Sequence, residues 1–323
     1  MEIDSKAENR FGRIGVLMGG PSTEREISLR SGKAVCDALK GSGLEAVAID
    51  LKTDNKEEVV SLIKSNNLDC VFLALHGSFG EDGQIQDILE TLKMPYTGSG
   101  VKASKLAMDK IASRRIFEAA GLNVPRYKVL DKGYRNEDLR SCDNLGLPLV
   151  VKPAGQGSSI GLSIIHKEEG LKKALDLAFS VDTKAIIEEY ITGREMTVGI
   201  LDGRPLPVIE IIPRNPFFDY EAKYQSGSTA YIVPARIEEG IAEKIKAAAL
   251  SAHKLLGCFG CSRVDIILNN AGLAVVLEVN SIPGLCATSL LPKAAKSAGI
   301  EFNELCVKLI KLAYEKTPVA STD

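Results

Sequence analysis

Two carboxylates and an amide stand near one end of a predicted β-hairpin, and their side-chain types suit metal binding. Residues 263–268 and 273–280 are β-prone apolar runs separated by a turn-forming Asn-Asn-Ala-Gly segment. Side chains alternate between the two faces of a strand, which places Asp265, Glu278 and Asn280 on one face. Carboxylate and amide oxygens are ligands for Mg²⁺ rather than for Zn²⁺. A solvated sheet face with an arginine–carboxylate pair is the alternative interpretation, and the spacing alone favours neither.

The pairing of this hairpin decides which side chains reach its two faces. With Leu268 opposite Leu273, Arg263 joins the polar face and lies there with Ile267 and Val276. The other face is then wholly apolar and is predicted to be core: Val264, Ile266, Leu268, Leu273, Val275, Leu277 and Val279. This register therefore separates a candidate metal site from a core face.

A glycine-rich segment at residues 154–161 is the second feature with chemical content. It follows Lys152, and glycines such as Gly157 let backbone N–H groups approach a phosphate while the lysine adds positive charge. A flexible hairpin loop is the competing interpretation. A Gly-x-Ser-x-Gly match centred on Ser159 suggests a serine hydrolase, but that motif needs a strand-to-helix turn, and a strand is predicted to follow here.

Other side chains with reactive groups carry weaker signals. His76 comes just after a predicted strand, where open α/β sheets bind ligands, although a lone histidine is more often structural. Glu188 and Glu189 end an apolar strand, where they could contact a nucleobase or a ribose, although the sequence alone favours contact with solvent only. Cys258 and Cys261 form a Cys-x-x-Cys pair without the further ligands of a zinc site, so a structural role is favoured.

Strands that alternate with helices are predicted to position the N-terminal candidates. The strands lie at residues 13–18, 46–49 and 70–75. The first helix is predicted to open with a capping box of Thr23 and Glu26, and a second helix covers residues 57–65. This alternation predicts a parallel sheet with helices on both faces, ending near residue 100.

The rest of the chain reads as mixed α and β structure. A helix is predicted over 103–120, where Gly121 stops it. Further strands are predicted at 149–152, 162–165, 185–189, 196–201 and 207–212, and further helices at 168–179, 240–256 and 302–313. Residues 213–234 are polar and aromatic without periodicity, which indicates a long functional loop.

Composition limits the classes of protein that the 323 residues can form. The 40 basic and 42 acidic residues give a net charge of −2, so no basic field attracts nucleic acid or an anionic membrane. No apolar run approaches the ~18 residues of a membrane span, and the polar start of the chain is unlike a signal peptide. The 7 cysteines, an odd number in a long chain, favour a reducing, cytoplasmic setting over a disulfide scaffold.

The order and spacing of these motifs resemble D-alanine–D-alanine ligases of the ATP-grasp superfamily over about residues 13–313. The matching segments are 19–29, 75–83, 96–100, 108–110, 152–161, 219–224, 263–265 and 278–284. The resemblance implies an N-terminal Rossmann-like parallel-sheet domain followed by a two-subdomain α+β ATP-grasp fold. The implied boundaries are 1–100 for the first domain, 101–192 for the central subdomain and 193–323 for the C-terminal subdomain, in which residues 213–234 close over the site.

The resemblance also implies a role for each matching position. ATP would contact Lys110, Lys152, Gly157, Ser159, Glu188, Glu189, Ile191, Glu195 and Lys223. Two Mg²⁺ ions, with Mn²⁺ as an alternative, would be held by Asp265, Glu278 and Asn280. His76 and Leu290 would bind substrate, and the catalytic group would comprise Glu24, Ser158, Tyr224, Arg263, Gly284 and Ser289.

The implied reaction joins two D-alanine molecules for the synthesis of a peptidoglycan precursor. ATP phosphorylates the carboxylate of the first D-alanine, and the amine of the second displaces phosphate from the acyl phosphate. Glu24, Ser158 and Tyr224 would shut the long loop over the site, and Tyr224 favours D-alanine over D-lactate as the second substrate. The acyl phosphate is sensitive to water, which explains why a closing loop is needed.

The resemblance implies a cytoplasmic homodimer that binds no nucleic acid and does not insert into membranes. Two other functions stay open: an ATP-grasp ligase with D-serine or D-lactate as acceptor, and a nucleotide-binding sensor without turnover. Two departures from the family pattern bear on specificity. Glu189 and Tyr190 occupy variable positions of the adenine pocket, and Cys286-Ala287 is less polar than expected for the second-substrate loop.

Overall fold

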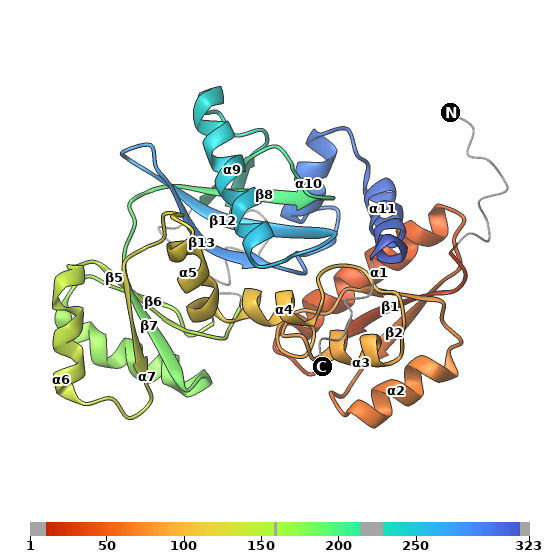
Figure 1. Ribbon diagram of the computed structural model, residues 1–323, viewed down its shortest axis with the longest axis horizontal. Helices are drawn as coiled ribbons and strands as arrows, with labels where there is room; N and C mark the ends of the chain where they lie inside the picture. The colour runs from red at the N-terminus through yellow and green to blue at the C-terminus, as the bar shows by residue number, and fades with distance from the viewer. Residues whose placement is uncertain (1–10, 158–159, 214–228, 317–323) are drawn as a thin grey trace.

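Three separate sheets organise the chain, as the computed structural model shows for residues 11–157, 160–213 and 229–316 (Figure 1). The first sheet has the order β2-β1-β3 and is parallel throughout, which confirms the predicted alternation. Its strands are β1 (Ile14–Gly19), β2 (Ala46–Leu51) and β3 (Cys70–Leu73). The helices that follow them are α1 (Arg25–Gly41), α2 (Lys56–Ser65) and α3 (Gln84–Thr91).

The predicted capping box at the start of α1 is wrong. The helix begins at Arg25, and its N-cap residue Glu24 makes no side-chain capping bond. Ser22 instead accepts a hydrogen bond from the Glu24 N–H at 3.2 Å and donates one to the His76 carbonyl at 2.6 Å. The Ser22 hydroxyl therefore joins the loop before α1 to the segment that follows β3.

The helix predicted over residues 103–120 is two helices, α4 (Val101–Met108) and α5 (Lys110–Ala119). Asp109 breaks it, because its carboxylate accepts hydrogen bonds from the N–H groups of Ile111 and Ala112 at 2.9 and 3.0 Å. An aspartate that caps its own following turn stabilises a new helix start. The break places Lys110 at the first position of α5.

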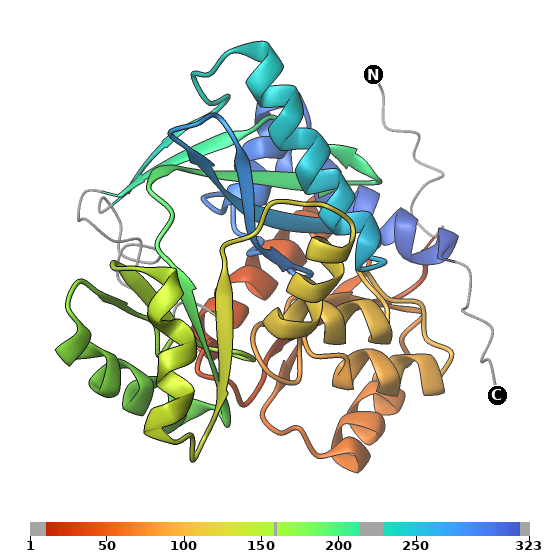
Figure 2. The same cartoon turned by 60° about the vertical axis from the view of Figure 1, so that its left-hand side comes forward.

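The second sheet is antiparallel, with the order β4-β7-β5-β6. Its strands are β4 (Tyr127–Asp131), β5 (Leu149–Pro153), β6 (Ser163–Ile165) and β7 (Lys184–Glu189), and it is accompanied by α6 (Asn136–Leu139), η2 (Arg140–Leu145), η3 (Glu168–Gly170) and α7 (Leu171–Val181). β5 and β6 pair around the glycine-rich segment, which confirms the predicted hairpin. β4 was not predicted. Figure 2 turns this sheet toward the viewer and shows it apart from the other two.

The third sheet is also antiparallel, with the order β11-β10-β8-β12-β13 and β9 added beside β8. Its strands are β8 (Gly193–Leu201), β9 (Arg204–Pro205), β10 (Ile209–Pro213), β11 (Thr229–Ile232), β12 (Cys261–Asn269) and β13 (Ala274–Asn280). The interpretation of residues 213–234 as a loop is wrong at β11, which gains backbone partners by extending the sheet edge at β10. Residues 214–228 lie outside the described part of the chain.

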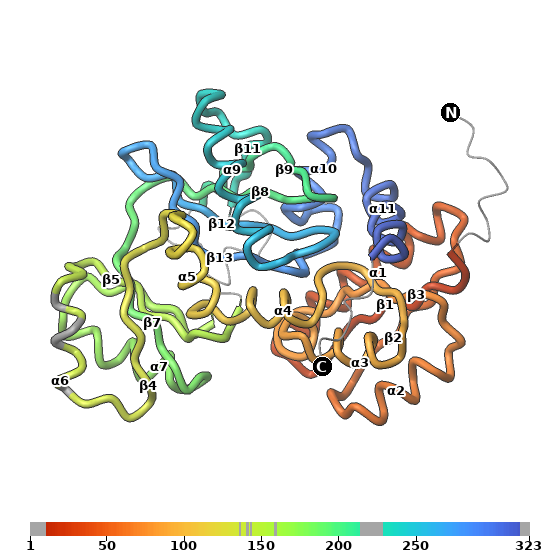
Figure 3. Tube along the Cα trace, viewed as in Figure 1, coloured from red at the N-terminus to blue at the C-terminus, as the bar shows by residue number. Residues whose placement is uncertain are grey.

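Helices from the C-terminal half cover the third sheet and also reach the first. α9 (Glu239–Leu255) packs its buried side chains against β8, β12 and β13. α10 (Leu290–Ser297) packs on β8, and α11 (Phe302–Glu315) packs on α1, as the tube view in Figure 3 shows. One apolar cluster therefore joins β1 and α1 to α10 and α11.

The register of the β12–β13 hairpin differs from the predicted one at both ends. Leu268 pairs with Ala274, not Leu273, and a bulge beyond Asp265 shifts the register again. Leu273 is consequently 49% exposed, and Leu277 lines a cavity, so both were wrongly predicted as core. Val276, expected on the polar face, is fully buried.

The two shifts together return the side chains at the far end of the hairpin to their predicted faces. Asp265 pairs directly with Glu278, and Arg263 pairs with Asn280. Each one-residue shift exchanges the two faces of a strand, so two shifts restore the original alternation. The predicted polar cluster is therefore present, although the pairing used to derive it is not.

The buried side chain of His253 should make the free energy of unfolding depend on pH. Its ring on α9 is 3% exposed, and Nδ1 hydrogen-bonds the Ser262 hydroxyl at 2.7 Å. Burial lowers the pKa of His253 from 6.5 to about 4, so only the unfolded chain takes up this proton as the pH falls through 6.5. The free energy of unfolding should therefore decrease on acidification, by about 2 kcal/mol from this group between pH 7 and 5.

Urea denaturation at pH 7, 6 and 5 checks this sign. His253→Gln should flatten the pH dependence, with part of it remaining because burial also lowers the pKa of His76 to about 4. His166→Gln is the control, since His166 is exposed. Equal slopes for the wild type and His253→Gln would contradict the expectation.

Candidate active site

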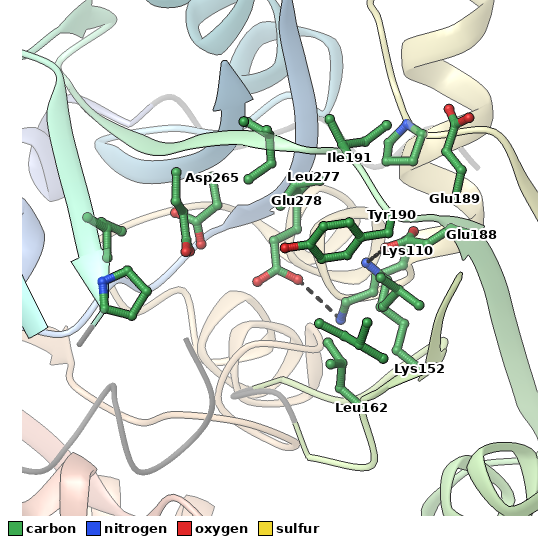
Figure 4. Close-up of a pocket in the computed structure, with 18 of the residues that line it drawn as sticks. Lys110, Lys152, Leu162, Glu188, Glu189, Tyr190, Ile191, Asp265, Leu277 and Glu278 are labelled. Atoms are coloured by element: carbon green, nitrogen blue, oxygen red, sulfur yellow. Dashed lines mark ion pairs between the residues drawn. The ribbon is translucent and has the colours of Figure 1, made fainter. Parts of the chain in front are cut away.

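A cavity of about 620 Å³ is lined by residues from both antiparallel sheets. β5, β6 and β7 supply one wall, and β8, β10, β12 and β13 supply the other. The apolar lining includes Val150, Ile164, Ile191, Ile211 and Leu277, whereas Lys110, Lys152, Glu188, Asp265 and Glu278 bring charge (Figure 4). A largely preformed, mostly apolar cavity with a few convergent charged groups is typical of a small-molecule site.

Lys110 reaches across the cavity from α5. Its ammonium donates to the Gln156 carbonyl at 2.6 Å and lies 3.5 Å from a carboxylate oxygen of Glu278 on β13. The side chain of Lys110 is 9% exposed, and that of Glu278 is 24% exposed. One cation therefore connects the glycine-rich segment to the polar face of the hairpin.

Lys152 belongs to a buried network of three charges. It forms an ion pair with Glu188 at 2.8 Å, and the other carboxylate oxygen of Glu188 contacts Arg114 on α5. Burial lowers the pKa of Lys152 to about 8, although Glu188 opposes this effect. Burial would also raise the pKa of Glu188, but Arg114 and Lys152 outweigh it and hold that pKa below its usual value.

Asp265 is held in a fixed orientation at the polar end of the hairpin. Arg263 donates to both of its oxygens, at 2.9 and 2.7 Å. Thr197 on β8 donates to one oxygen at 2.7 Å, and the Asn280 amide approaches the other at 3.3 Å. These contacts leave the carboxylate oriented toward the cavity that it lines.

The donor set at this end of the hairpin fits Mg²⁺. Asp265 and Glu278 pair across the two strands and both line the cavity, and Asn280 contributes an amide within reach of Asp265. No group of three or more His, Cys, Asp or Glu side chains suited to a metal occurs in the described residues. Two carboxylates and an amide leave coordination positions for water and phosphate oxygens, which is how Mg²⁺ is commonly bound.

A second group of polar side chains lies around the segment that follows β3. His76 is buried, and its Nε2 lies 3.2 Å from the Ser31 hydroxyl, which also accepts from the Leu285 N–H at 3.4 Å. Burial lowers the pKa of His76 to about 4, so the ring is neutral at pH 7. Burial and the charge of Glu24 raise the pKa of nearby Glu81 to about 8, although the Gly77 N–H donates to it at 2.7 Å.

Glu24 connects this group to the glycine-rich segment. A Cβ atom added to Gly157 would lie 3.5 Å from a carboxylate oxygen of Glu24, and one added to Gly77 would lie 2.9 Å from it. Gly77 has a φ of +73°, a conformation that favours glycine. The buried Glu24 carboxylate therefore lies close to both segments.

The loop before α10 brings together the C-terminal candidates. Ser289 is the N-cap of α10, and its hydroxyl accepts from the Cys286 N–H at 3.2 Å. A Cβ atom added to Gly284 would lie 3.0 Å from that hydroxyl, so a larger residue at this position would displace it. Leu290 is the first residue of α10 and is partly buried.

The predicted site residues therefore fall into three sets. The cavity lining contains Lys110, Lys152, Gly157, Glu188, Glu189, Ile191, Glu195, Asp265 and Glu278. Seven others lie outside that lining: Glu24, His76, Arg263, Asn280, Gly284, Ser289 and Leu290. Ser158, Ser159, Lys223 and Tyr224 lie outside the described residues.

Three residues of this region were missed by sequence reasoning. Thr197 and Arg114 contact the charged groups from neighbouring elements, and only the fold brings them there. Arg114 lies four residues after Lys110 in a predicted helix, which places both side chains on one face, and this spacing could have identified it. Glu81 lies inside the motif at 75–83 and was not singled out.

The thiols of the Cys-x-x-Cys pair and the strand after the Gly-x-Ser-x-Gly match both argue against reactive roles. Burial raises the pKa of Cys258 to about 11 and that of Cys261 to about 12, so both thiols are protonated at neutral pH. This agrees with a structural role for the pair. The glycine-rich segment leads into β6, a strand, whereas a nucleophile elbow needs a helix there.

Two antiparallel sheets that enclose a cavity, with Lys152 on one sheet and Asp265 and Glu278 on the other, form an ATP-grasp fold. The family model "D-ala D-ala ligase C-terminus" matches residues 116–311, and "D-ala D-ala ligase N-terminus" matches residues 52–99. The chain belongs to the D-alanine–D-alanine ligase family.

Individual relatives agree with this assignment. A D-alanine–D-alanine ligase of Pelotomaculum thermopropionicum is 48% identical over 312 residues, covering 94% of this chain and 97% of the relative. The crystal structure of the Bacillus anthracis ligase complexed with ATP superposes with a TM-score of 0.83 at 35% identity, covering 94% of this chain and 97% of that one. The VanG D-Ala:D-Ser ligase of Enterococcus faecalis superposes with a TM-score of 0.81 at 32% identity, covering 93% and 99%.

Proposed function

We propose that this chain joins two molecules of D-alanine into D-alanyl-D-alanine, converting ATP to ADP and phosphate. The observation that carries the proposal is the facing arrangement of Lys110 and Lys152 with Asp265 and Glu278 in one cavity. Phosphoryl transfer depends on positioning and on cations that neutralise the phosphates, not on a protein nucleophile. The family assignment supplies the amino-acid substrate, and the product is a building block of peptidoglycan.

In the proposed first step, the carboxylate of one D-alanine attacks the γ-phosphate, which yields an acyl phosphate and ADP. Lys110 and Lys152 would bind phosphates, and Glu188, Glu189, Ile191 and Glu195 would bind the adenosine part. Lys223, Gly157 and Ser159 are assigned to phosphate contacts on family resemblance. Mg²⁺ would neutralise phosphate charge, and we assign two ions to Asp265, Glu278 and Asn280.

In the proposed second step, the amine of the other D-alanine attacks the acyl phosphate and the tetrahedral intermediate expels phosphate. Glu24 and His76 would position the first D-alanine, and Ser289 with Leu290 would bind the carboxylate of the second. Arg263 and the Gly284 N–H would stabilise the oxyanion. Ser158 and Tyr224 would close the loop over the site together with Glu24.

The compartment, the oligomeric state and the domain division of the protein are also proposed. Among the described residues, no helix has the length and apolarity that crossing a membrane requires. We infer that the protein is a cytoplasmic homodimer. We divide each chain into a domain at residues 1–100 and two subdomains at 101–192 and 193–323. Size-exclusion chromatography with light scattering tests the dimer.

Incubation with ATP, Mg²⁺ and D-alanine should release phosphate and form the dipeptide in equal amounts. Mass spectrometry of the products and a coupled phosphate assay measure both. D-serine and D-lactate, each added with D-alanine, form the acceptor panel, and a preference for either would reassign the second substrate. Nucleotide binding without phosphate release for any acceptor would favour the sensor function instead.

A further inference from the structure

Arg114 is a buried cation that does not line the cavity. It lies one helical turn after Lys110 on α5 and is fully buried, with its guanidinium 5.3 Å from the centre of the Tyr127 ring. Within the described part of the chain, its Nε and Nη1 find no hydrogen-bond acceptor. A buried cation with unused donors is costly, so its presence calls for an explanation other than packing.

The geometry around Glu188 suggests that explanation. One carboxylate oxygen faces Lys152 at 2.8 Å, and the other contacts Arg114, so each cation has an oxygen of its own. Lys152 lines the cavity and can turn to a ligand, whereas Arg114 is enclosed and cannot. If Lys152 moves to a phosphate, Glu188 still has a cation in contact.

We propose that Arg114 is a positioning residue for nucleotide binding, which neutralises Glu188 permanently and thereby releases Lys152 to an ATP phosphate. This inference rests on the proposed function, since it assigns Lys152 to phosphate. Without Arg114, a buried carboxylate would lose its last counter-charge when Lys152 left, and that penalty would oppose ATP binding. Arg114 also lowers the pKa of Lys152, as expected for a cation that competes for the same carboxylate.

The test is a double-mutant cycle on nucleotide affinity, measured by calorimetry with the Mg²⁺ complex of the β,γ-imido analogue of ATP. Arg114→Gln should weaken binding by about ten- to one-hundred-fold. In the Glu188→Gln background the same substitution should change the affinity by less than about threefold, because no carboxylate charge then competes for Lys152. Arg114→Lys keeps the charge and should recover most of the affinity.

Matched controls separate this role from a structural one. Arg115→Gln removes the same charge from the next position of α5, where the side chain is exposed, and should leave the affinity unchanged. The KM for D-alanine should also stay within about twofold in Arg114→Gln. Equal effects of Arg114→Gln in both backgrounds, or an Arg114→Lys variant as weak as Arg114→Gln, would overturn the proposal. A wild type that does not bind the nucleotide would instead overturn the proposed function.

Discussion

Replacing Glu278 by glutamine should reduce kcat by about 10³-fold or more while leaving the protein folded. The substitution keeps the shape of a partly exposed side chain but removes a negative charge from the proposed metal site. Metal ions contribute several kcal/mol of transition-state stabilisation in phosphoryl transfer, so weakening their binding has a large kinetic effect. The variant should also need a higher Mg²⁺ concentration for half-maximal rate, which a titration at fixed ATP measures.

The control for this experiment is Glu210→Gln. Glu210 also lines the cavity from the third sheet, but both its oxygens are bonded to Arg194, at 2.7 and 2.6 Å, and no role in the reaction is assigned to it. We expect its kcat to stay within about tenfold of the wild type. A Glu278→Gln variant with a kcat in that same range would rule out its role as a metal ligand.

Glu188→Leu should be the most destabilising single substitution in the cavity. The side chain of Glu188 is 4% exposed, and its removal leaves Arg114 and Lys152 as two buried cations with no anion between them. Breaking a buried ion pair by removing one partner costs about 3–5 kcal/mol. Urea denaturation at pH 7 should show this loss in the free energy of unfolding, and nucleotide binding should fall with it.

The next residue on the same strand provides the comparison. Glu189 pairs with Arg126 at 2.7 Å, but the Arg126 side chain is 61% exposed. Glu189→Leu should therefore cost less than about 1 kcal/mol, as expected for a surface ion pair. Similar losses for the two variants would mean that the network around Glu188 contributes little to stability.

The hairpin of β12 and β13 shows how far local patterns predict a site. Alternation within each strand places Asp265 with Arg263 and Glu278 with Asn280, and this much survives any error in pairing. The pairing itself depends on the turn at Asn269 and on the bulge near Leu277, neither of which leaves a signal in strand composition. The polar cluster was predicted because two errors of one residue compensated each other.

The residues at which helices begin were less predictable, because the same residue can either continue a helix or cap the start of a new one. Asp109 reads equally well as a helical residue or as a cap, and its side-chain bonds to the next turn decide between them. Thr23 and Glu26 have capping-box spacing, but the Ser22 hydroxyl ties this loop to His76 instead. Such competition is settled by tertiary contacts, which the local sequence does not contain.

Partners supplied by distant elements were not predictable at all. Arg114 meets Glu188 across 74 positions of sequence, and Thr197 meets Asp265 across 68. Only the sheet order and the placement of α5 bring these side chains together. The family resemblance supplied the residues that we propose contact ligands, whereas the side chains that support them became visible only with the fold.

The apolar cluster that joins β1 and α1 to α10 and α11 has a consequence for how the protein is made. A ribosome adds about 5–20 residues per second, so α1 is synthesised more than about ten seconds before α11. During that interval Val35 and Leu39 of α1 lack the C-terminal side chains, such as Leu305 and Leu309, that complete their cluster. Nascent chains of this enzyme therefore hold only the N-terminal part of this cluster, from β1, α1 and β3, until the C-terminal helices are synthesised.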